Sequence, residues 1–443
     1  MEGDVITHFE ADHLVQSLQE IDIKQYASSA WDRQHEAIYK LNLQSHRNAR
    51  AREDEFVLDL IVTWDKVKVL IHDLITSQVW KQNVLPLVQE AVCSLNSARS
   101  YMLVYHEAMV SNFLEVLLYH RTACEEAGDL LVDLIGWTYS KLVSLNSFEH
   151  EETLTSELSR SEELQYQLKE LEFGMGISCL SIVRFITDHL EGLTLAVVQQ
   201  LIEQCDIFCV LVPLMETKPW VKDTKNGKLI YENQQWLKLR DSAKVPKVEA
   251  QIWLTVYNLF MNQDVRSKYE LTSYRKNNLL RLRKFLNETV IDQIPVLGNL
   301  LRALEEMSIM NEGSTSKISA FLIQQMPELA NNICVNRNWQ EIAEHQRKNY
   351  LVETEESRKR MMDLLMTGLD DMLEDPTCAN CGVPATNRCS KCHSEWYCSR
   401  KCQVEAWKKH KQICAVLAEQ VTKKQPSEAT QSKPKIEDIT DSK

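Results

Sequence analysis

The stretch CANCGVPATNRCSKCHSEWYCSRKCQVEAWKKHKQIC, residues 378–414, decides the fold of the C-terminal part of this chain. Its metal-ligating side chains come in four closely spaced pairs: Cys378 and Cys381, Cys389 and Cys392, Cys398 and Cys402, His410 and Cys414. A Cys-x2-Cys turn can direct two thiolates at one tetrahedral ion, and a spacing of three residues places two ligands one helical turn apart. Four such pairs in so short a span predict two closed structural zinc sites, and not a set of unrelated buried cysteines.

The spacing alone leaves the pairing of these ligands open. Sequential pairing would give two zinc sites that follow one another along the chain. Interleaved pairing would close longer loops and tie the whole stretch into one body. It would give one site of Cys378, Cys381, Cys398 and Cys402, and a second of Cys389, Cys392, His410 and Cys414. His393 is a spare imidazole, and we expect it to be exposed because the second site already has four ligands.

This stretch resembles the MYND family of zinc fingers. The family pattern is Cys-x2-Cys, Cys-x2-Cys, Cys-x3-Cys and His-x3-Cys, with an aromatic residue directly before the third pair. Here that step is Trp396-Tyr397-Cys398. MYND domains cross-brace two zinc ions, so the resemblance implies the interleaved pairing.

The resemblance also implies a peptide groove. MYND domains that bind proline-containing peptides use a groove along the helix of the last ligands, whose residues map onto Ser390, Gln403 and Trp407. Gln403 and Trp407 are four residues apart and would share one helix face. Trp407 would then stack on the proline, while Gln403 and Ser390 would bond the peptide backbone. The alternative is that Trp407 only packs against the zinc core and Gln403 is solvated.

The rest of the chain is typical of a helical protein. Among 443 residues there are only 11 glycines and 10 prolines, and average usage of glycine alone is about 7%, which disfavours a turn-rich β architecture. Helical periodicity dominates residues 56–375, and several segments are apolar around most of their circumference. We predict a mainly α fold: a stacked helical array of armadillo or HEAT type, although no clean repeat period is present.

Three regions follow from this pattern. Residues 1–375 are the predicted helical array domain, because Pro376 disfavours helix at the residue before it. Residues 378–414 are the zinc finger. Residues 422–443 have almost nothing to bury, so we expect a disordered tail.

Several local features carry their own expectations. Residues 216–247 are charged and predict a long loop or a small excursion, and a long charged helix is expected from Trp339 to about Leu373. Residues 275–284 hold five basic residues and no acid, so this helix could dock an acidic partner or present a solvated face. Cys205 and Cys209 could share a helix face and bind metal, but without a third ligand nearby we interpret them as core residues.

No catalytic constellation is found. His106-Glu107 begins like a zinc-protease helix, but position 110 is valine, so the second histidine is missing. There is no phosphate-binding glycine loop, no dinucleotide fingerprint and none of the glycine-rich segments of MYND methyltransferases. Closed zinc shells do structural work. We therefore predict a protein that is not an enzyme, with no catalytic residues, no small-molecule substrate and two structural Zn²⁺ as its cofactors.

The composition of the chain limits the partners and the compartment that can be expected for it. The formal charge of −13 argues against a general nucleic-acid binder. The first residues show no secretory signal, and the longest apolar runs are too short to span a membrane. Thirteen cysteines in an unsecreted chain imply reduced thiols.

The resemblance extends beyond the finger to a family of axonemal dynein assembly factors with a C-terminal MYND finger. The segments that carry it are WDRQHEAIYKLN, ITSQVWKQNVLPLV, YHEAMVSNFLEVL, LSIVRFITDHL, QIWLTVYNL, YELTSYRKNNLLRLRKFL and WQEIAEHQ. It implies a cytoplasmic adaptor, at centriolar satellites or dynein-assembly foci of ciliated cells. The implied partners are a leucine-rich-repeat assembly factor, chaperones and dynein chains. The competing hypothesis is a nuclear corepressor adaptor whose finger binds proline-containing peptides.

Overall fold

The computed structural model describes residues 5–150, 158–224, 227–239, 244–309 and 327–352, and within the finger 378–381, 383, 385, 387–391, 395–407, 410, 411 and 414. These residues fall into two compact units, one within residues 4–367 and one within residues 368–443. We call the first the helical body and the second the finger unit. The predicted domain end at 375 and the tail at 422–443 lie outside the described residues.

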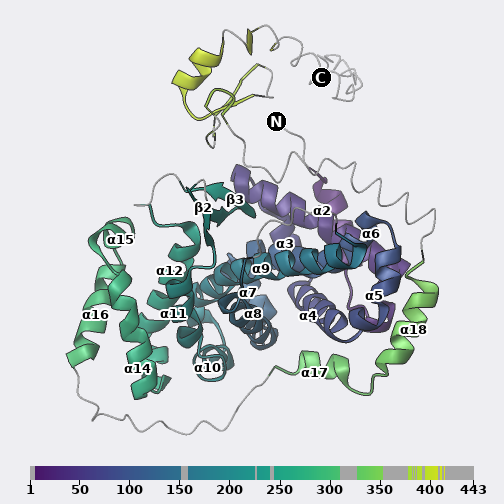
Figure 1. Cartoon of the computed structure of the whole chain (residues 1–443), viewed down its shortest axis with the longest axis horizontal. Coiled ribbons are helices and arrows are strands. Elements are labelled where there is room, and N and C mark those ends of the chain that lie inside the picture. Colours follow the sequence, from purple (N-terminus) through teal and green to yellow (C-terminus); the bar gives the residue numbers. More distant parts are fainter. Residues whose placement is uncertain are drawn as a thin grey trace, which may run out of the picture. The chain divides into compact units, whose positions relative to one another are not determined.

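The helical body is mainly α, as predicted (Figure 1). Its α-helices are α1 (His8–Ser17), α2 (Ser29–Ala51), α3 (Phe56–Thr63), α4 (Val67–Asn83), α5 (Leu85–Ser94), α6 (Ser97–Leu118), α7 (Arg121–Ala127), α8 (Leu130–Asn146), α9 (Arg160–Asp188), α10 (Leu195–Gln199), α11 (Ile207–Thr217), α12 (Lys247–Met261), α13 (Gln263–Lys268), α14 (Ser273–Leu280), α15 (Glu288–Gln293), α16 (Leu297–Ile309), α17 (Leu329–Cys334) and α18 (Trp339–Asn349). Short helical turns interrupt them at η1 (Ile23–Gln25), η2 (Leu190–Gly192), η3 (Gln200–Gln204) and η4 (Arg281–Phe285).

The long helices pack in two rows. In one row α6 contacts α2 and α9, and α9 contacts α12. In the other row α8 contacts α4 and α11, and α11 contacts α14. The rows meet where α6 packs on α4 and α9 packs on α8. The core between them is apolar and includes the fully buried Trp31, Trp80, Trp220 and Trp253. The assignment of this array to the armadillo or HEAT type stays a prediction.

Helix starts follow from the local sequence. The polar segment before α9 ends in Ser159, whose hydroxyl accepts from the backbone N–H of Glu162, while the Glu162 carboxylate accepts from the Ser159 backbone. This reciprocal capping box satisfies two helix N–H groups that would otherwise lack a partner. Ser28 caps α2 in the same manner by accepting from the Trp31 N–H. Such caps fix where the two longest helices begin.

A buried polar centre lies inside the apolar core. Glu107 of α6 is fully buried and meets Lys81 at 2.8 Å and Lys141 at 2.9 Å. The indole N–H of Trp137 donates to the same carboxylate at 2.9 Å. Burial opposes ionisation of Glu107, but the two ammonium groups outweigh it and lower its pKa to about 2. The Glu that began like a protease motif is therefore the anion of a buried ion cluster.

Beside this cluster, His106 belongs to a second buried chain of contacts. Its Nε2 lies 3.2 Å from an Asp73 carboxylate oxygen, and its Nδ1 lies 2.8 Å from Nδ1 of His35. Gln34 donates to the same Asp73 oxygen at 3.0 Å. Because a neutral histidine carries one proton, the Nε2–H of His106 faces Asp73, and its Nδ1 accepts from the Nδ1–H of His35. This arrangement accounts for the polar groups of His35 and His106 without a metal.

The segment at 216–247 folds as a small excursion, and the alternative of a long loop is wrong. It contains an antiparallel sheet in the order β1 (Val221–Thr224), β2 (Gly227–Glu232), β3 (Gln235–Lys238). Asn233 and Gln234 join β2 to β3, and both have positive φ, as a tight hairpin turn requires. Tyr231 and Trp236 pack their rings against Phe173 of α9. The charged residues of this segment obscured the alternating pattern of its strands, in which Tyr231 and Trp236 lie opposite each other.

The expected helix from Trp339 to Leu373 is wrong at residues 350–352. The helix α18 ends at Asn349, whose side chain donates to the His345 carbonyl at 2.8 Å. The chain then turns so that Leu351 is buried, and its N–H donates to the Gln346 carbonyl. Burial of this apolar side chain is favoured over continuing an exposed helix. Residues 353–373 lie outside the described part of the chain.

The basic segment at 275–284 is partly neutralised within the body. Arg275 pairs with Asp206 at 2.6 Å, and both Arg281 and Lys284 pair with Glu216. The segment is also not one regular helix, because α14 passes into the tighter turn η4 at Arg281. A free basic face for an acidic partner is therefore smaller than the sequence indicates.

The two cysteines near this segment, Cys205 and Cys209, flank Asp206 at the start of α11. Cys205 is buried and Cys209 half-buried, and they belong to none of the possible metal-ligating groups among the described residues.

Within the described residues, no single helix is long and apolar enough to cross a membrane, although the bent pair Leu195–Gln204 and Ile207–Thr217 has sufficient length and composition together.

Candidate metal centre

The finger unit is built from short elements that bring distant cysteines together. Strands β4 (Asn387–Arg388) and β5 (Trp396–Tyr397) pair antiparallel, with Asn387 opposite Tyr397. The Trp396 carbonyl accepts from the Ala379 N–H at 2.9 Å, which ties the first Cys-x2-Cys turn to β5. The last ligands lie on or beside a helical segment at 400–407, where the Ser399 hydroxyl accepts from the Cys402 N–H.

The first site brings together Cys378, Cys381, Cys398 and Cys402, whose sulfurs all lie within 4.8 Å of one another. The Sγ–Sγ distances are 3.6 Å from Cys381 to Cys398, 3.5 Å from Cys398 to Cys402 and 3.7 Å from Cys402 to Cys381. Four sulfurs at a Zn–S distance of 2.3 Å in a tetrahedron stand about 3.8 Å apart. The thiols therefore already have the spacing that one zinc ion requires.

The second site brings together Cys389, His410 and Cys414, again within 4.8 Å and all buried. Nε2 of His410 lies 3.3 Å from Sγ of Cys389, and the two sulfurs are 3.9 Å apart. The predicted fourth ligand, Cys392, and the spare imidazole of His393 lie outside the described residues. Both clusters join ligands from the two halves of the finger, which is the grouping of the interleaved arrangement.

The chemistry of these donors fits zinc. Burial opposes ionisation of Cys378, but backbone N–H groups of Cys398, Asn380 and Cys381 outweigh it and lower its pKa to about 6. The neighbouring thiols of Cys402 and Cys381 raise the pKa of Cys398 to about 12. Four crowded thiols cannot all ionise unless a cation offsets their charge, and soft thiolates are the ligands that Zn²⁺ prefers. The finger thus has two structural zinc sites, and zinc supplies folding energy at each.

Some residues that hold the finger together were not singled out from the sequence as structural. Tyr397 is fully buried, and Ala385 joins it in a small apolar cluster with three of the cysteines. Asn380 donates to Glu405 at 2.9 Å and so links the first turn to the helical segment. The aromatic step before Cys398 was the sequence signal for the buried ring, whereas a single Asn–Glu pair leaves no signal.

The three predicted groove residues lie on two separate elements. Trp407 is 39% exposed, so it does not serve only as core, and its ring lies 5.8 Å from that of His410. Gln403 is half-buried on the same helical segment, and Ser390 is exposed on the turn after Cys389. The described contacts join Trp407 to His410 and leave Ser390 on its own turn, so the peptide groove stays a prediction.

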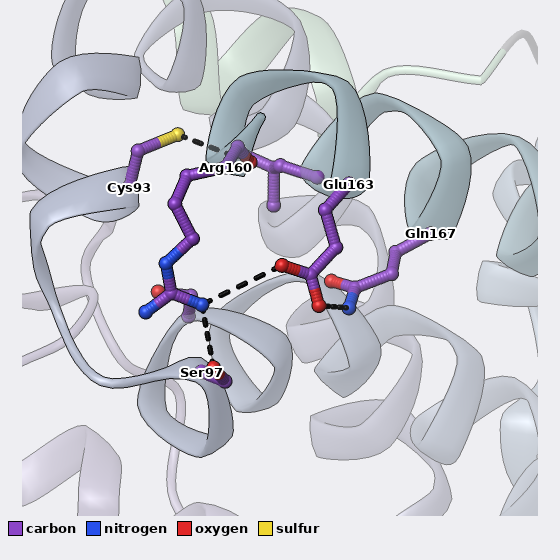
Figure 2. A pocket seen from close by; sticks show the side chains of 7 residues that line it. Cys93, Ser97, Arg160, Glu163 and Gln167 are labelled. Atoms are coloured by element: carbon purple, nitrogen blue, oxygen red, sulfur yellow. Dashed lines mark hydrogen bonds and ion pairs between the residues drawn. The ribbon is translucent and has the colours of Figure 1, made fainter. Parts of the chain in front are cut away.

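The body holds a shallow pocket that is lined by a cysteine and several polar side chains (Figure 2). Arg160 reaches Ser97 and Glu163, and the thiol of Cys93 lies against the Arg160 carbonyl at 3.8 Å. Burial raises the pKa of Cys93, which is the reverse of what an activated thiol needs. The polar groups that Figure 2 shows are therefore engaged with one another.

Comparison with known proteins agrees with this geometry. Residues 378–414 match the family described as MYND finger. The chain is 27% identical over 437 residues to the zinc finger MYND domain-containing protein 10 homolog of Drosophila melanogaster, which covers 90% of this chain and 96% of that protein.

Shorter matches reach proteins of other kinds. Tudor domain-containing protein 1 of Mus musculus is 36% identical over 59 residues, 13% of this chain and 5% of that protein. Ubiquitin C-terminal hydrolase 15 of Oryza sativa subsp. japonica is 55% identical over 38 residues, 8% of this chain and 4% of that protein. No solved structure matches the chain with significance. Residues 378–414 are therefore a MYND finger, and the chain is similar over 90% of its length to the zinc finger MYND domain-containing protein 10 homolog.

Proposed function

We propose that this protein is a non-enzymatic adaptor whose finger is a protein–protein docking module. The observation that carries the proposal is the similarity over 90% of the chain to another MYND-finger protein. The described donors of the finger group around two closed sites, and such sites support a fold without presenting a reactive water. The finger then offers a rigid surface for recognition, while the body offers a second and larger one. Two modest contacts on one chain gain affinity through effective concentration.

The client of this adaptor is, in our proposal, the axonemal dynein arm during its assembly in the cytoplasm. The resemblance to dynein assembly factors supports this assignment. The partners would be a leucine-rich-repeat assembly factor, chaperones and dynein chains. The reduced cysteines expected of the body fit that compartment.

Within the finger, we propose that Trp407 anchors a proline-containing segment of a partner. Trp407 is 39% exposed, and among the described residues of the finger the other large exposed apolar residue is Val404, at 65%. Tryptophan anchors often dominate the binding energy of an interface. Gln403 and Ser390 would supply hydrogen bonds to the peptide backbone, which gives direction and register.

The cellular role is tested by affinity purification from ciliated cells of the full chain and of a Cys402→Ala variant. Recovery of dynein chains and chaperones with the full chain, and their loss with the variant, is the expected result. Recovery of chromatin proteins instead would favour the nuclear corepressor hypothesis. Cells lacking the protein should build cilia of normal length without dynein arms, and normal beating with intact arms would reject the role.

The groove is tested by Trp407→Ala, with Val404→Ala as the matched control on the same helical segment. We expect Trp407→Ala to weaken binding of a proline-containing partner peptide at least about tenfold, because loss of an aromatic anchor costs about 2 kcal/mol or more. Both variants should retain their zinc, and Val404→Ala should bind as the unmodified protein does. Equal affinity of the zinc-loaded Trp407→Ala protein, by calorimetry, would place the docking site elsewhere.

A further inference from the structure

The last described part of the body, residues 327–352, crosses helices that lie far earlier in the chain. We call it the strap. Its helix α17 packs on α4, and α18 packs on α5 and the turn η1 (Figure 1). These contacts join residues more than 250 positions apart, such as Trp80 and Gln346. The strap therefore occupies a groove that the N-terminal helices form without it.

The side chain of Gln346, in the strap, forms hydrogen bonds with two buried polar groups of this groove. The amide oxygen of Gln346 accepts from the indole N–H of Trp80 at 2.8 Å, and its amide nitrogen donates to the Ile23 carbonyl at 2.8 Å. Both Trp80 and Gln346 are fully buried. The amide supplies the donor and the acceptor that these two partners require. The floor of the groove is thus built to recognise an amide side chain.

Charge fixes one end of the strap. Arg337 binds Asp22 with both terminal nitrogens, at 2.6 and 3.2 Å. Arg337 stands nine positions before Gln346. Between them, Ile342 and Ala343 are buried against the body. The groove therefore selects an arginine just before a helix, and an apolar pair and an amide within that helix.

The strap buries a smaller share of its residues than α4, on which its first helix packs. Three of the 11 residues of α18 are buried, and one of the six of α17, whereas α4 buries ten of its 17. Helices shorter than about 12 residues are marginal when undocked. A cavity of about 250 Å³ remains between the strap and the body, lined by Glu20, His72, Leu130, Leu329, Asn332, Ile333 and Arg337. Local opening is favoured where buried contacts are few.

We propose that the strap is an exchangeable occupant of this groove, and that the groove binds an amphipathic helix of a partner when the strap leaves. The partner helix is preceded directly by an arginine and carries an apolar pair followed three residues later by an amide. The strap and the partner compete, so the strap lowers the apparent affinity of the groove by the fraction of time that it stays docked. This docking site is on the body and does not depend on the finger.

A labelled peptide of residues 337–351, RNWQEIAEHQRKNYL, probes the groove in the full chain by fluorescence anisotropy. The variant Arg337→Glu with Gln346→Ala loosens the strap and leaves Asp22, Trp80 and Ile23 intact. We expect this variant to bind the peptide at least tenfold more tightly than the unmodified chain. Gln340→Ala, an exposed strap position, is the matched control and should change nothing. A peptide carrying the Gln346→Ala change should bind at least tenfold more weakly.

Equal peptide affinity of all three proteins would overturn the proposal. Hydrogen exchange of the unmodified chain gives a second measurement that needs no variant. The amides of α18 should exchange at least tenfold faster than those of α6, because they open without global unfolding. Exchange of α18 at the rate of α6 would mean that the strap is a permanent part of the core. Binding of a proline-containing peptide to the finger should be unchanged in the strap variant, which separates this test from that of the proposed function.

Discussion

The body and the finger reach a folded state by different means. The body buries tens of apolar side chains between two rows of helices, and it can also bury a charged cluster at Glu107 because ammonium groups surround it. The described core of the finger is one small cluster of five buried residues, three of them cysteines. A chain so short cannot bury enough apolar area to offset its conformational entropy. The finger therefore depends on bound zinc for its folding, whereas lysine side chains of the body itself supply the positive charge around its buried Glu107.

Removing one zinc ligand is the change with the largest expected effect. Cys402→Ala should unfold the finger, because metal-binding free energy is folding free energy in so small a module. Elemental analysis should find two zinc ions per chain before the change and fewer after it. The thermal unfolding of the body should stay the same. Cys334→Ala, a half-buried cysteine of the body, is the control and should retain both ions. One zinc or none in the unmodified, reduced protein would contradict the two-site assignment.

Breaking the charge cluster of the body is expected to cost about 3–5 kcal/mol of unfolding free energy. Glu107→Leu removes the anion and leaves Lys81 buried without this counter-charge, while Lys141 keeps only Glu172. Chemical denaturation measures the loss. Combining it with Lys81→Met and Lys141→Met should restore most of the stability, since a buried ion cluster replaced by apolar groups is often neutral. A triple variant as unstable as Glu107→Leu alone would show that the cluster adds net stability.

Acid should destabilise the body through His35. Burial, with His106 and Arg99 nearby, holds the pKa of His35 well below its usual value. The unfolded chain takes up this proton below about pH 6.5 and the folded chain does not, so the stability is complete above that pH and falls below it. The slope is up to about 1.4 kcal/mol per pH unit. Denaturation of His35→Asn between pH 7 and 5 should show a flatter profile, while the exposed His345→Asn should not. Parallel profiles for His35→Asn and the unmodified chain would reject this assignment.

Glu126 should act in the opposite direction. Its carboxylate accepts from the Val67 N–H at the start of α4, and burial raises its pKa to about 7. The folded chain therefore keeps a proton that the unfolded chain loses near pH 4.5, so stability declines as pH rises from about 4.5 through 7. Glu126→Gln keeps the acceptor without the charge and should be more stable at pH 8 by about 1 kcal/mol. The exposed Glu125→Gln is the control. No gain at pH 8 would mean that Lys68 already compensates the charge.

The smallest expected effect concerns whether the body folds independently of the finger. A fragment of residues 1–375 should be soluble and unfold cooperatively at the same temperature as the body in the full chain. The reason is that the body contains its own apolar core and its own counter-charges. Circular dichroism of the fragment measures this directly. A fragment that is unfolded while the full chain is folded would show that the two regions form one domain.

The sequence predicted more of the structure of the finger than of the body. In the finger, ligand type and spacing predicted two zinc sites, whereas the grouping of Cys378 with Cys402 and of Cys389 with Cys414 followed only from the resemblance to MYND fingers. In the body, periodicity predicted helices but not which helices pack together, because the apolar face of one helix does not determine which other helix covers it. The strap contact of Gln346 with Trp80 spans 266 positions and leaves no local pattern. The hairpin at 227–238 was not predicted because its charged positions alternate with a half-buried face that carries Tyr231 and Trp236.

The interleaved ligands of the finger also set an order on its synthesis. The first site cannot close until Cys402 has left the ribosome, and the second waits for Cys414, which is 25 positions after its partner Cys389. Until then Cys378 and Cys381 are exposed with no partners from the second half. A nascent chain therefore holds an unfinished chelate that can take zinc, oxidise or be recognised by quality control. A ribosome that stops between Cys378 and Cys414 leaves one site or both sites open, so Cys414 marks the completed finger.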